Sequence, residues 1–292
     1  MDRTLAAFKA GSAFARVLPE RVANRLARAA GFGAARVSPE RRAQVERNLR
    51  RVYGPGLRGA VLRHAVDETF ESYARYWAES FRLPGTTPEQ LDAGLTVDGL
   101  EHLDEGIARG KGVILALPHL GGWEWAGFWV STVYKLPITV VVEALDPPEL
   151  FDWFVGLRRS FGMNVVALGP DAAAQVARAL KSNHVVCLLC DRDIGGAGVE
   201  VEFFGERTTL PGGPATLALR SGAPLLPTAA YFRGRGHHGV VRPPVPAERH
   251  GGLRDDVTRV TQLLANELEV LIRAAPEQWH LLQPNWPSDR SE

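Results

Sequence analysis

Cysteine is scarce in this chain of 292 residues, which holds only Cys187 and Cys190. The two lie three positions apart in the apolar run "VVCLLCD", and residues at that spacing on a strand point to opposite faces. No second cysteine pair or histidine pair completes a zinc site, so we expect buried structural thiols and no metal, with a redox or metal role as the alternative. The scarcity also excludes a disulfide framework, which fits a reducing, cytoplasmic compartment.

Long hydrophobic runs are missing too. None approaches the roughly 18 apolar residues of a membrane-spanning helix. Arg3, Lys9 and Arg16 interrupt the first twenty residues, so this segment lacks the continuous apolar centre of a signal peptide. We therefore expect a chain that neither spans a membrane nor is exported.

Net charge is small over the whole chain but not over its N-terminal fifth. The formal charge is +1, and 45% apolar and 23% charged residues are an ordinary globular composition, so the chain as a whole is not a polyanion binder. The first 60 residues contain thirteen basic and four acidic residues, which gives this segment a net charge of +9. This segment suits an anionic surface, either phospholipid headgroups or nucleic acid.

An apolar helical side accompanies these basic residues, which favours the membrane over nucleic acid because exposed aromatic residues on a sheet are absent from the segment. That side consists of Leu5, Phe8, Phe14, Val17 and Leu18.

Residues 1–82 have helical patterns throughout. The segment "SPERRAQVERNLRRVYG" begins with Ser38 as a cap and Pro39 at the first helical position, and it ends at Gly54. The next helical segment carries large apolar residues at spacings of three and four, and this stripe predicts core packing, with the wall of a groove for an apolar ligand as the alternative. Its members are Val66, Phe70, Tyr73, Trp77 and Phe81.

From residue 95 to about 286, short β-branched runs alternate with helical segments. Because the runs lack an alternation of apolar and polar residues, we expect strands that are covered on both faces, as in a parallel sheet flanked by helices. The runs are "KGVILALP", "ITVVVEA", "NVVAL" and "HVVCLLCD", followed later by "PLLPTAAYF" and "GVVRPP". A long helix is expected from about Leu253 to Arg273.

No internal repeat or low-complexity linker divides the chain. We predict one α/β domain over residues 1–292, with a helical, basic, membrane-facing N-terminal part over residues 1–82. Residues 95–286 then form the α/β core, a central, mostly parallel sheet flanked by helices.

The stretch "LALPHLGGWEWAG" places His119 just past an expected strand, with Glu124 at the start of an expected helix near Trp123. Side chains at the carboxyl ends of parallel strands face the crevice where ligands bind, and the first N–H groups of a helix there can hold an oxyanion or a phosphate. A structural or solvent-exposed histidine is the alternative.

A second polar cluster ends another expected strand, where "CLLCDRD" carries Asp191, Arg192 and Asp193. A histidine with a carboxylate on one ring nitrogen is a general base whose tautomer is fixed and whose charged form is stabilised. A solvated loop with local ion pairs is the alternative for this cluster. No G-x-S-x-G motif is present, which argues against a serine hydrolase.

Four ordered blocks carry a resemblance to a known family. They are H-x4-E at His119 to Glu124, "DRD", "GVEVEFFGERTTLPGGPATLALRSGAPLLP" and "PEQWHLLQPNW". Over residues 70–286 the chain resembles the lipid A biosynthesis and phosphatidylinositol mannoside acyltransferases. The segments "ARYWAESFRLP", "LCDRD" and "VEFFGERT" are more similar to the actinobacterial phosphatidylinositol mannoside branch.

The resemblance implies a glycerolipid-acyltransferase-like fold and a peripheral enzyme on the cytoplasmic face of the inner membrane. Such an enzyme moves an acyl chain, expected to be palmitoyl, from acyl-CoA to a mannose hydroxyl of a phosphatidylinositol mannoside. Acyl-CoA is then a substrate, and no cofactor, nucleic acid or obligate protein partner is implied. The alternatives are an acyltransferase for a lysophospholipid or other glycolipid, and a non-catalytic lipid-binding protein of the same fold.

The resemblance also implies site residues. His119 is the catalytic histidine, Glu124 the acid of the first motif and Asp191 the acid of the later strand. The mannoside enzymes carry Asp in the first place and Glu in the second, so this chain has the two acids exchanged. We expect Asp191 to pair with the imidazole, because it arrives from a different strand end while Glu124 lies in the first turn of its helix.

In the expected reaction, His119 takes the proton of the sugar hydroxyl as it attacks the thioester, and a carboxylate stabilises the imidazolium. Backbone N–H groups near Gly121 to Trp123, or a basic side chain, receive the oxyanion, and no covalent acyl-enzyme is required. The aromatic residues of the following helix either line an acyl tunnel or pack against the sheet. These residues are Trp123, Trp125, Phe128 and Trp129.

The phosphates of CoA require cations, and guanidinium groups suit them. The candidates are Arg158, Arg192, Arg207 and Arg220, with ordinary surface arginines as the alternative. By resemblance, Arg158 pairs with Glu143 near the active site, and the loop of Arg220, Ser221, Gly222 and Ala223 lies near the CoA. Asp193 is counted with this binding set.

Overall fold

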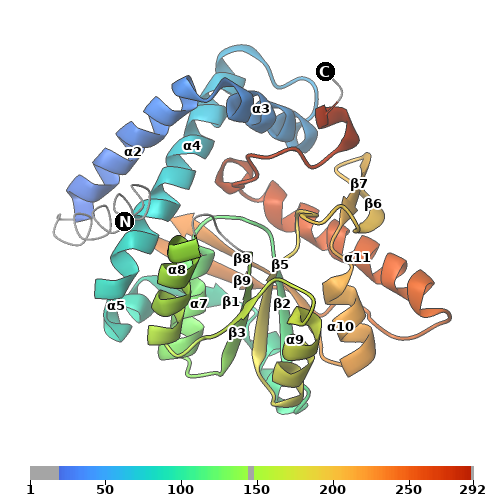
Figure 1. The fold of residues 1–292 in the computed structure, drawn as a ribbon. Helices are drawn as coiled ribbons and strands as arrows, with labels where there is room; N and C mark the ends of the chain where they lie inside the picture. The colour runs from blue at the N-terminus through green and yellow to red at the C-terminus, as the bar shows by residue number, and fades with distance from the viewer. Residues whose placement is uncertain (1–19, 144–147, 291–292) are drawn as a thin grey trace.

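A computed structural model of the chain describes residues 20–143 and 148–290 (Figure 1). The predicted apolar side of the opening segment, from Leu5 to Leu18, lies outside the described residues. Residues 20–82 are mostly helical, as predicted, with α2 (Glu20–Val37), α3 (Pro39–Tyr53) and α4 (Gly59–Arg82). Helix α2 packs closely on α4, because a Cβ on Gly31 would lie only 2.6 Å from the carbonyl oxygen of Phe70.

A seven-stranded, mostly parallel sheet forms the centre of the molecule, as predicted, in the order β1-β9-β8-β2-β5-β3-β4. All neighbouring pairs are parallel except β8 with β9. A separate antiparallel hairpin holds β6 (Val199–Phe203) and β7 (Glu206–Leu210). The strands of the main sheet are β1 (Leu95–Asp98), β2 (Val113–Leu117), β3 (Ile138–Val142), β4 (Asn164–Ala167), β5 (Val185–Leu189), β8 (Leu225–Arg233) and β9 (Gly236–Val241).

Helices cover both faces of this sheet, with α7 and α8 on one side in Figure 1 and α10 and α11 on the other. The central strand β2 shows the consequence: Ile114 packs in one core cluster, under α9, α10 and α11, while Leu115 packs in another, near α6. Both faces are apolar, which explains why the sequence shows no alternation there. The remaining elements are α5 (Pro88–Ala93), α6 (Leu100–Ala108), α7 (Trp123–Thr132), α8 (Pro148–Ser160), α9 (Ala172–Lys181), α10 (Gly213–Ser221) and α11 (Leu253–Arg273), with short 3₁₀ turns at Leu83–Gly85, Pro276–Gln278 and Pro287–Arg290.

Cys187 of β5 and Cys190, one residue past the end of β5, lie on opposite sides of the sheet, as predicted. Cys190 is buried in the cluster under α9 to α11, and Cys187 packs on the α7 side. Both thiols are free, and burial raises the pKa of Cys187 to about 12. Such thiols stay protonated and unreactive at neutral pH, which agrees with a structural role.

The C-terminal segment crosses the carboxyl edge of the sheet after α11. We call residues 278–285 the C-terminal strap. It forms an isolated antiparallel bridge between Trp279 and Leu120, just past β2. Within the part of the chain that the structure describes, no helix is long and apolar enough to cross a membrane.

Candidate active site

His119 and Asp191 meet at the carboxyl edge of the sheet because β2 and β5 are parallel neighbours. Each residue follows the last residue of its strand by two positions. The Nδ1 atom of His119 lies 2.6 Å from Oδ1 of Asp191, and the backbone N–H of His119 donates to Oδ2 at 3.0 Å. The expected pairing of the imidazole with Asp191 rather than Glu124 is therefore confirmed.

Asp191 is fully buried, yet its surroundings favour the ionised form. Burial alone raises the pKa of this carboxyl, but the charge and hydrogen bonds of His119, together with the indole N–H of Trp279 at 2.8 Å, outweigh it and hold the pKa below its usual value. An ionised partner at Nδ1 implies a proton on that nitrogen and a lone pair on Nε2. No described residue hydrogen-bonds to Nε2, and the His119 side chain is 21% exposed. This is the arrangement of a general base.

Glu124 has a different partner. It lies in the first turn of α7 and accepts a hydrogen bond from the guanidinium of Arg158 in the last turn of α8, where both side chains are nearly buried. Burial lowers the pKa of Arg158, but this pKa is nevertheless raised, chiefly by the charge and the hydrogen bond of Glu124. The pair is therefore a buried ion pair.

The pairing of Arg158 with Glu143, which the resemblance implied, is wrong in this structure. Glu143 instead accepts a hydrogen bond from Arg192 at 2.8 Å. The reason is topological: Glu143 follows β3 and Arg192 follows β5, and these strands are neighbours, whereas Arg158 lies over the start of α7.

The rest of the expected binding set is scattered. Asp193 closes a turn by accepting the N–H groups of Gly196 and Gly198 and the hydroxyl of Thr209. Arg207 lies on the separate β6–β7 hairpin, where it pairs with Glu200 in solvent. Arg220 and Ser221, expected in a loop, are the last residues of α10, and Gly222 and Ala223 follow them before β8. This segment lies at the amino edge of the parallel strands, opposite His119. The structure therefore does not bring the segment of Arg220 to Ala223 to the His119 edge.

The backbone donors expected for an oxyanion are partly occupied. The N–H of Gly121 donates to the carbonyl of Gln278 at 2.9 Å, and the N–H of Gly122 donates to the carbonyl of Ala230 at 2.7 Å. The expectation is therefore wrong for these two glycines. The first N–H groups of α7 itself, those of Trp123 and Glu124, have no described partner, as usual for the first turn of a helix.

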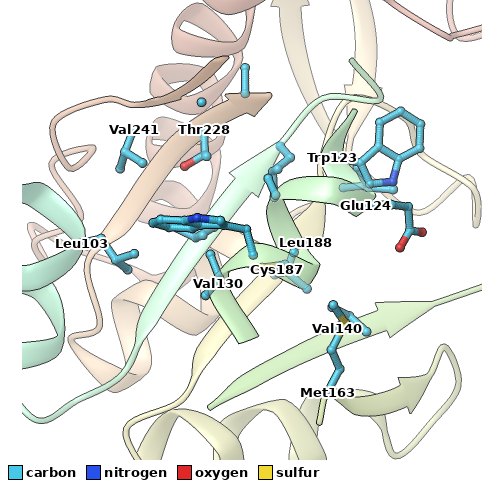
Figure 2. A pocket seen from close by; sticks show the side chains of 18 of the residues that line it. Leu103, Trp123, Glu124, Val130, Val140, Met163, Cys187, Leu188, Thr228 and Val241 are labelled. Atoms are coloured by element: carbon cyan, nitrogen blue, oxygen red, sulfur yellow. The ribbon is translucent and has the colours of Figure 1, made fainter. Parts of the chain in front are cut away.

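An apolar pocket lies between α7 and the sheet (Figure 2). Figure 2 shows Trp123 and Glu124 at one end and Leu103 and Val241 at the other. Its lining is almost wholly apolar, apart from the ion pair of Glu124 with Arg158 and from Thr228.

The aromatic residues of α7 divide between the two roles expected for them. Trp123 and Trp129 line the pocket. Trp125 donates its indole N–H to the carbonyl of Leu91, and Phe128 is completely buried in the core.

The stripe on α4 also divides. Val66 and Phe70 are core residues, as predicted. Towards the end of the helix Tyr76, which is not a member of the predicted stripe, stacks on Trp123 with ring centroids 4.1 Å apart. Trp123 in turn lies edge-on to His119 at 5.6 Å.

Sequence reasoning missed the site residues of the C-terminal strap. His280 donates its backbone N–H to the carbonyl of His119 at 2.7 Å, and its Nε2 lies 2.9 Å from the hydroxyl of Ser72. Burial lowers the pKa of His280 to about 3, so its ring is neutral. The only signal was the block "PEQWHLLQPNW", which no periodicity ties to residues 119 and 191.

Residues 6–288 match the model of the family described as bacterial lipid A biosynthesis acyltransferase. The chain belongs to this family. The acyltransferase is 41% identical over 292 residues to a phosphatidylinositol mannoside acyltransferase of Mycobacterium tuberculosis, covering 98% of this chain and 89% of the relative. It is 38% identical over 289 residues to the enzyme of the same name from Mycolicibacterium smegmatis, covering 98% and 92%.

A lipid A biosynthesis acyltransferase of Haemophilus influenzae is 24% identical over 269 residues, covering 90% of this chain and 80% of the relative. The resemblance seen in the sequence is thus confirmed at the level of the family and of its mannoside branch. For the acyltransferase itself, the roles of His119, Asp191 and Glu124 in catalysis stay predictions. Within residues 20–143 and 148–290, no three His, Cys, Asp or Glu side chains are grouped to hold a metal ion.

Proposed function

We propose that this acyltransferase moves an acyl chain from acyl-CoA to a mannose hydroxyl of a phosphatidylinositol mannoside, with His119 as the general base. The observation that carries the proposal is the buried Asp191 carboxylate on Nδ1 of His119, which leaves Nε2 to accept a proton. The acceptor class is supported by relatives that bear that name and are 38% and 41% identical over nearly the whole chain.

The reaction follows from this geometry. Nε2 of His119 takes the proton of the sugar hydroxyl as its oxygen attacks the thioester carbon, and Asp191 stabilises the imidazolium that forms. When the tetrahedral intermediate collapses, the carbon–sulfur bond breaks and the imidazolium returns its proton to the thiolate. The products are the ester and free CoA, and the base is regenerated. The N–H groups of Trp123 and Glu124, or the Arg158 guanidinium, are the candidates for the oxyanion.

The apolar pocket under α7 is the candidate for the acyl chain, expected to be palmitoyl. Trp123, which stands edge-on to His119, also lines this pocket, so the chain would run inward from the reacting carbon. A pocket with an almost wholly apolar lining favours a hydrocarbon chain over a polar ligand.

A peripheral position on the cytoplasmic face of the inner membrane is part of the proposal. Helix α2 exposes Val22, Leu26, Phe32 and Val37 to solvent. Arg25, Arg28 and Arg36 lie exposed on the same helix. Apolar side chains among arginines suit the interface of an anionic bilayer.

The test is product analysis with purified protein. A mixed acyl-CoA pool is offered with a phosphatidylinositol mannoside in one reaction and with a lysophospholipid in another, and products are identified by mass spectrometry. We expect an acylated mannoside with the wild type and none with His119→Gln. Faster acylation of the lysophospholipid would favour the alternative acceptor, and intact thioester with every acceptor would indicate a non-catalytic lipid-binding protein.

A further inference from the structure

Trp279 is buried against the carboxylate that serves His119. It is 3% exposed and packs against Phe203 and Phe204 of the β6–β7 hairpin. Its indole N–H donates to Oδ2 of Asp191 at 2.8 Å, on the oxygen that does not contact the imidazole. The family assignment gives this contact no role.

The strap around Trp279 is bonded to both members of the dyad. The N–H of His280 donates to the carbonyl of His119 at 2.7 Å, and the side-chain amide of Asn285 donates to the carbonyl of Asp191 at 3.1 Å. These bonds hold the backbone. Among the described residues of the strap, Trp279 alone donates a hydrogen bond to a side chain of the dyad, and this bond reaches the charged carboxylate.

We propose that Trp279 is a positioning residue for acyl transfer, which fixes the rotation of the Asp191 carboxylate and limits the negative charge that Oδ1 presents to His119. The inference rests on the proposed function. The indole N–H and the backbone N–H of His119 together hold Oδ2, so Oδ1 faces the imidazole in one orientation. Without the indole N–H, Oδ2 keeps a single donor and the charge on the carboxylate is less neutralised.

Loss of the indole N–H should move the acid limb of the pH–rate profile to higher pH. A less neutralised carboxylate stabilises the imidazolium more strongly, so more of the enzyme is protonated at a given pH and the acid limb of the pH–rate profile moves to higher pH. The other titratable groups beside Asp191 do not obscure this limb. Burial lowers the pKa of His280 to about 3 and raises the pKa of Cys190 well above neutral, so neither titrates in the working range.

Trp286 supplies a matched control. It is completely buried in the same C-terminal region and also packs on Phe203, but it donates its indole N–H to the carbonyl of Phe203 at 3.2 Å. Trp279→Phe and Trp286→Phe therefore each remove one buried indole N–H. We expect Trp279→Phe to lower kcat by roughly 10- to 100-fold, the loss typical of a hydrogen bond to a charged group. It should also shift the acid limb of the pH–rate profile to higher pH by about half a pH unit or more. Trp286→Phe should leave the limb at its wild-type pH.

A second replacement at position 279 keeps the test valid if Trp279→Phe does not fold. Incorporation of benzothienylalanine at position 279 keeps the shape of the indole but removes its N–H. Both Trp279 variants are also titrated with pH in the absence of substrate, by following the ring ¹H–¹³C NMR signals of His119. These signals are assigned by their absence from the spectrum of His119→Gln. We expect the midpoint of that titration to rise in both variants, even if acyl transfer to a mannoside is not the reaction. An unchanged midpoint with the isosteric residue would overturn the inference, while the product analysis above tests the proposed function separately.

Discussion

Asp191 and Glu124 both lie at the carboxyl edge of the sheet, but their carboxylates have different partners. Asp191 is bonded to the imidazole of His119, while Glu124 is bonded to the guanidinium of Arg158. Removing the first charge weakens a base, whereas removing the second leaves a buried cation without its counter-ion. The two residues should therefore separate activity from stability when they are substituted.

We expect Asp191→Asn to stay folded and lose about 10²- to 10⁴-fold in turnover, since an amide cannot stabilise the imidazolium. Glu124→Gln should stay within about tenfold of wild-type turnover but lose about 3 kcal/mol of unfolding free energy, because Arg158 keeps its charge in a nearly buried site. Turnover and urea denaturation of both variants measure the two effects.

The double variant Glu124→Gln with Arg158→Met is the control for that stability loss. It removes the buried charge as well as its partner, so we expect it to regain much of the stability that the single variant loses. The opposite outcome, an inactive Glu124→Gln and an active Asp191→Asn, would make Glu124 the acid of the dyad.

At the scale of elements, the sequence predicted the strands that carry the dyad and the strands beside them, β8 and β3, but not every strand of the sheet. Apolar runs before His119 and Asp191 identified β2 and β5, and the rule that parallel strands share a carboxyl edge predicted one crevice. The short β1, between α5 and α6, was missed. The place of Trp279 was not predictable either, because it depends on a contact between residues 88 positions apart.

Helix α7 forms one wall of the apolar pocket, and its Gly127 lies in that wall. A Cβ at Gly127 would lie 3.4 Å from Cε of Met163, so a larger side chain has little free space except the pocket itself. We expect Gly127→Leu to lower kcat/KM for palmitoyl-CoA by more than about tenfold and to leave decanoyl-CoA little affected, since a shortened pocket rejects the longer chain. Competition between the two thioesters measures the ratio.

Gly156→Leu is the matched control, because Gly156 lies in a helix on the same side of the sheet and a Cβ there would meet nothing within 4 Å. It should keep the wild-type preference. An unchanged ratio in Gly127→Leu would place the acyl chain elsewhere.

Helix α2 carries the other prediction at this scale. Leu26 is 50% exposed on a helix with exposed arginines, whereas Val270 is 47% exposed on α11. If α2 enters the interface, Leu26→Glu should reduce binding to anionic vesicles several-fold, and Val270→Glu should not, because only the first places a charge among headgroups. Co-sedimentation at low and high salt measures both. Equal losses would assign no special role to α2.

At the scale of the whole molecule, the pattern of apolar residues along the chain predicted the α/β class and the helical N-terminal part, but not how the parts are joined. The C-terminal strap contacts the N-terminal helices: Asn48 of α3 donates to the carbonyl of Leu281 at 2.7 Å, and the hydroxyl of Ser72 of α4 lies 2.9 Å from Nε2 of His280. The same strap bonds His119. The strap thus connects the N-terminal helices to the dyad through hydrogen bonds, and no local sequence pattern reports such a connection.

The neutral His280 also links global stability to pH. Its pKa of about 3 lies below the ordinary 6.5, so between these values the unfolded chain binds a proton that the folded chain does not, and stability falls as the pH falls. The lowered pKa of Asp191 adds a loss of the same sign at lower pH. We expect urea denaturation between pH 6 and 4.5 to show up to about 1.4 kcal/mol of lost stability per pH unit from His280. His280→Gln should flatten this slope by about one proton, while His64→Gln, at an exposed site, should keep it. If the dependence of stability on pH in His280→Gln equals that of the wild type, the His280 imidazole is protonated in the folded wild-type protein. A positive charge then lies beside His119.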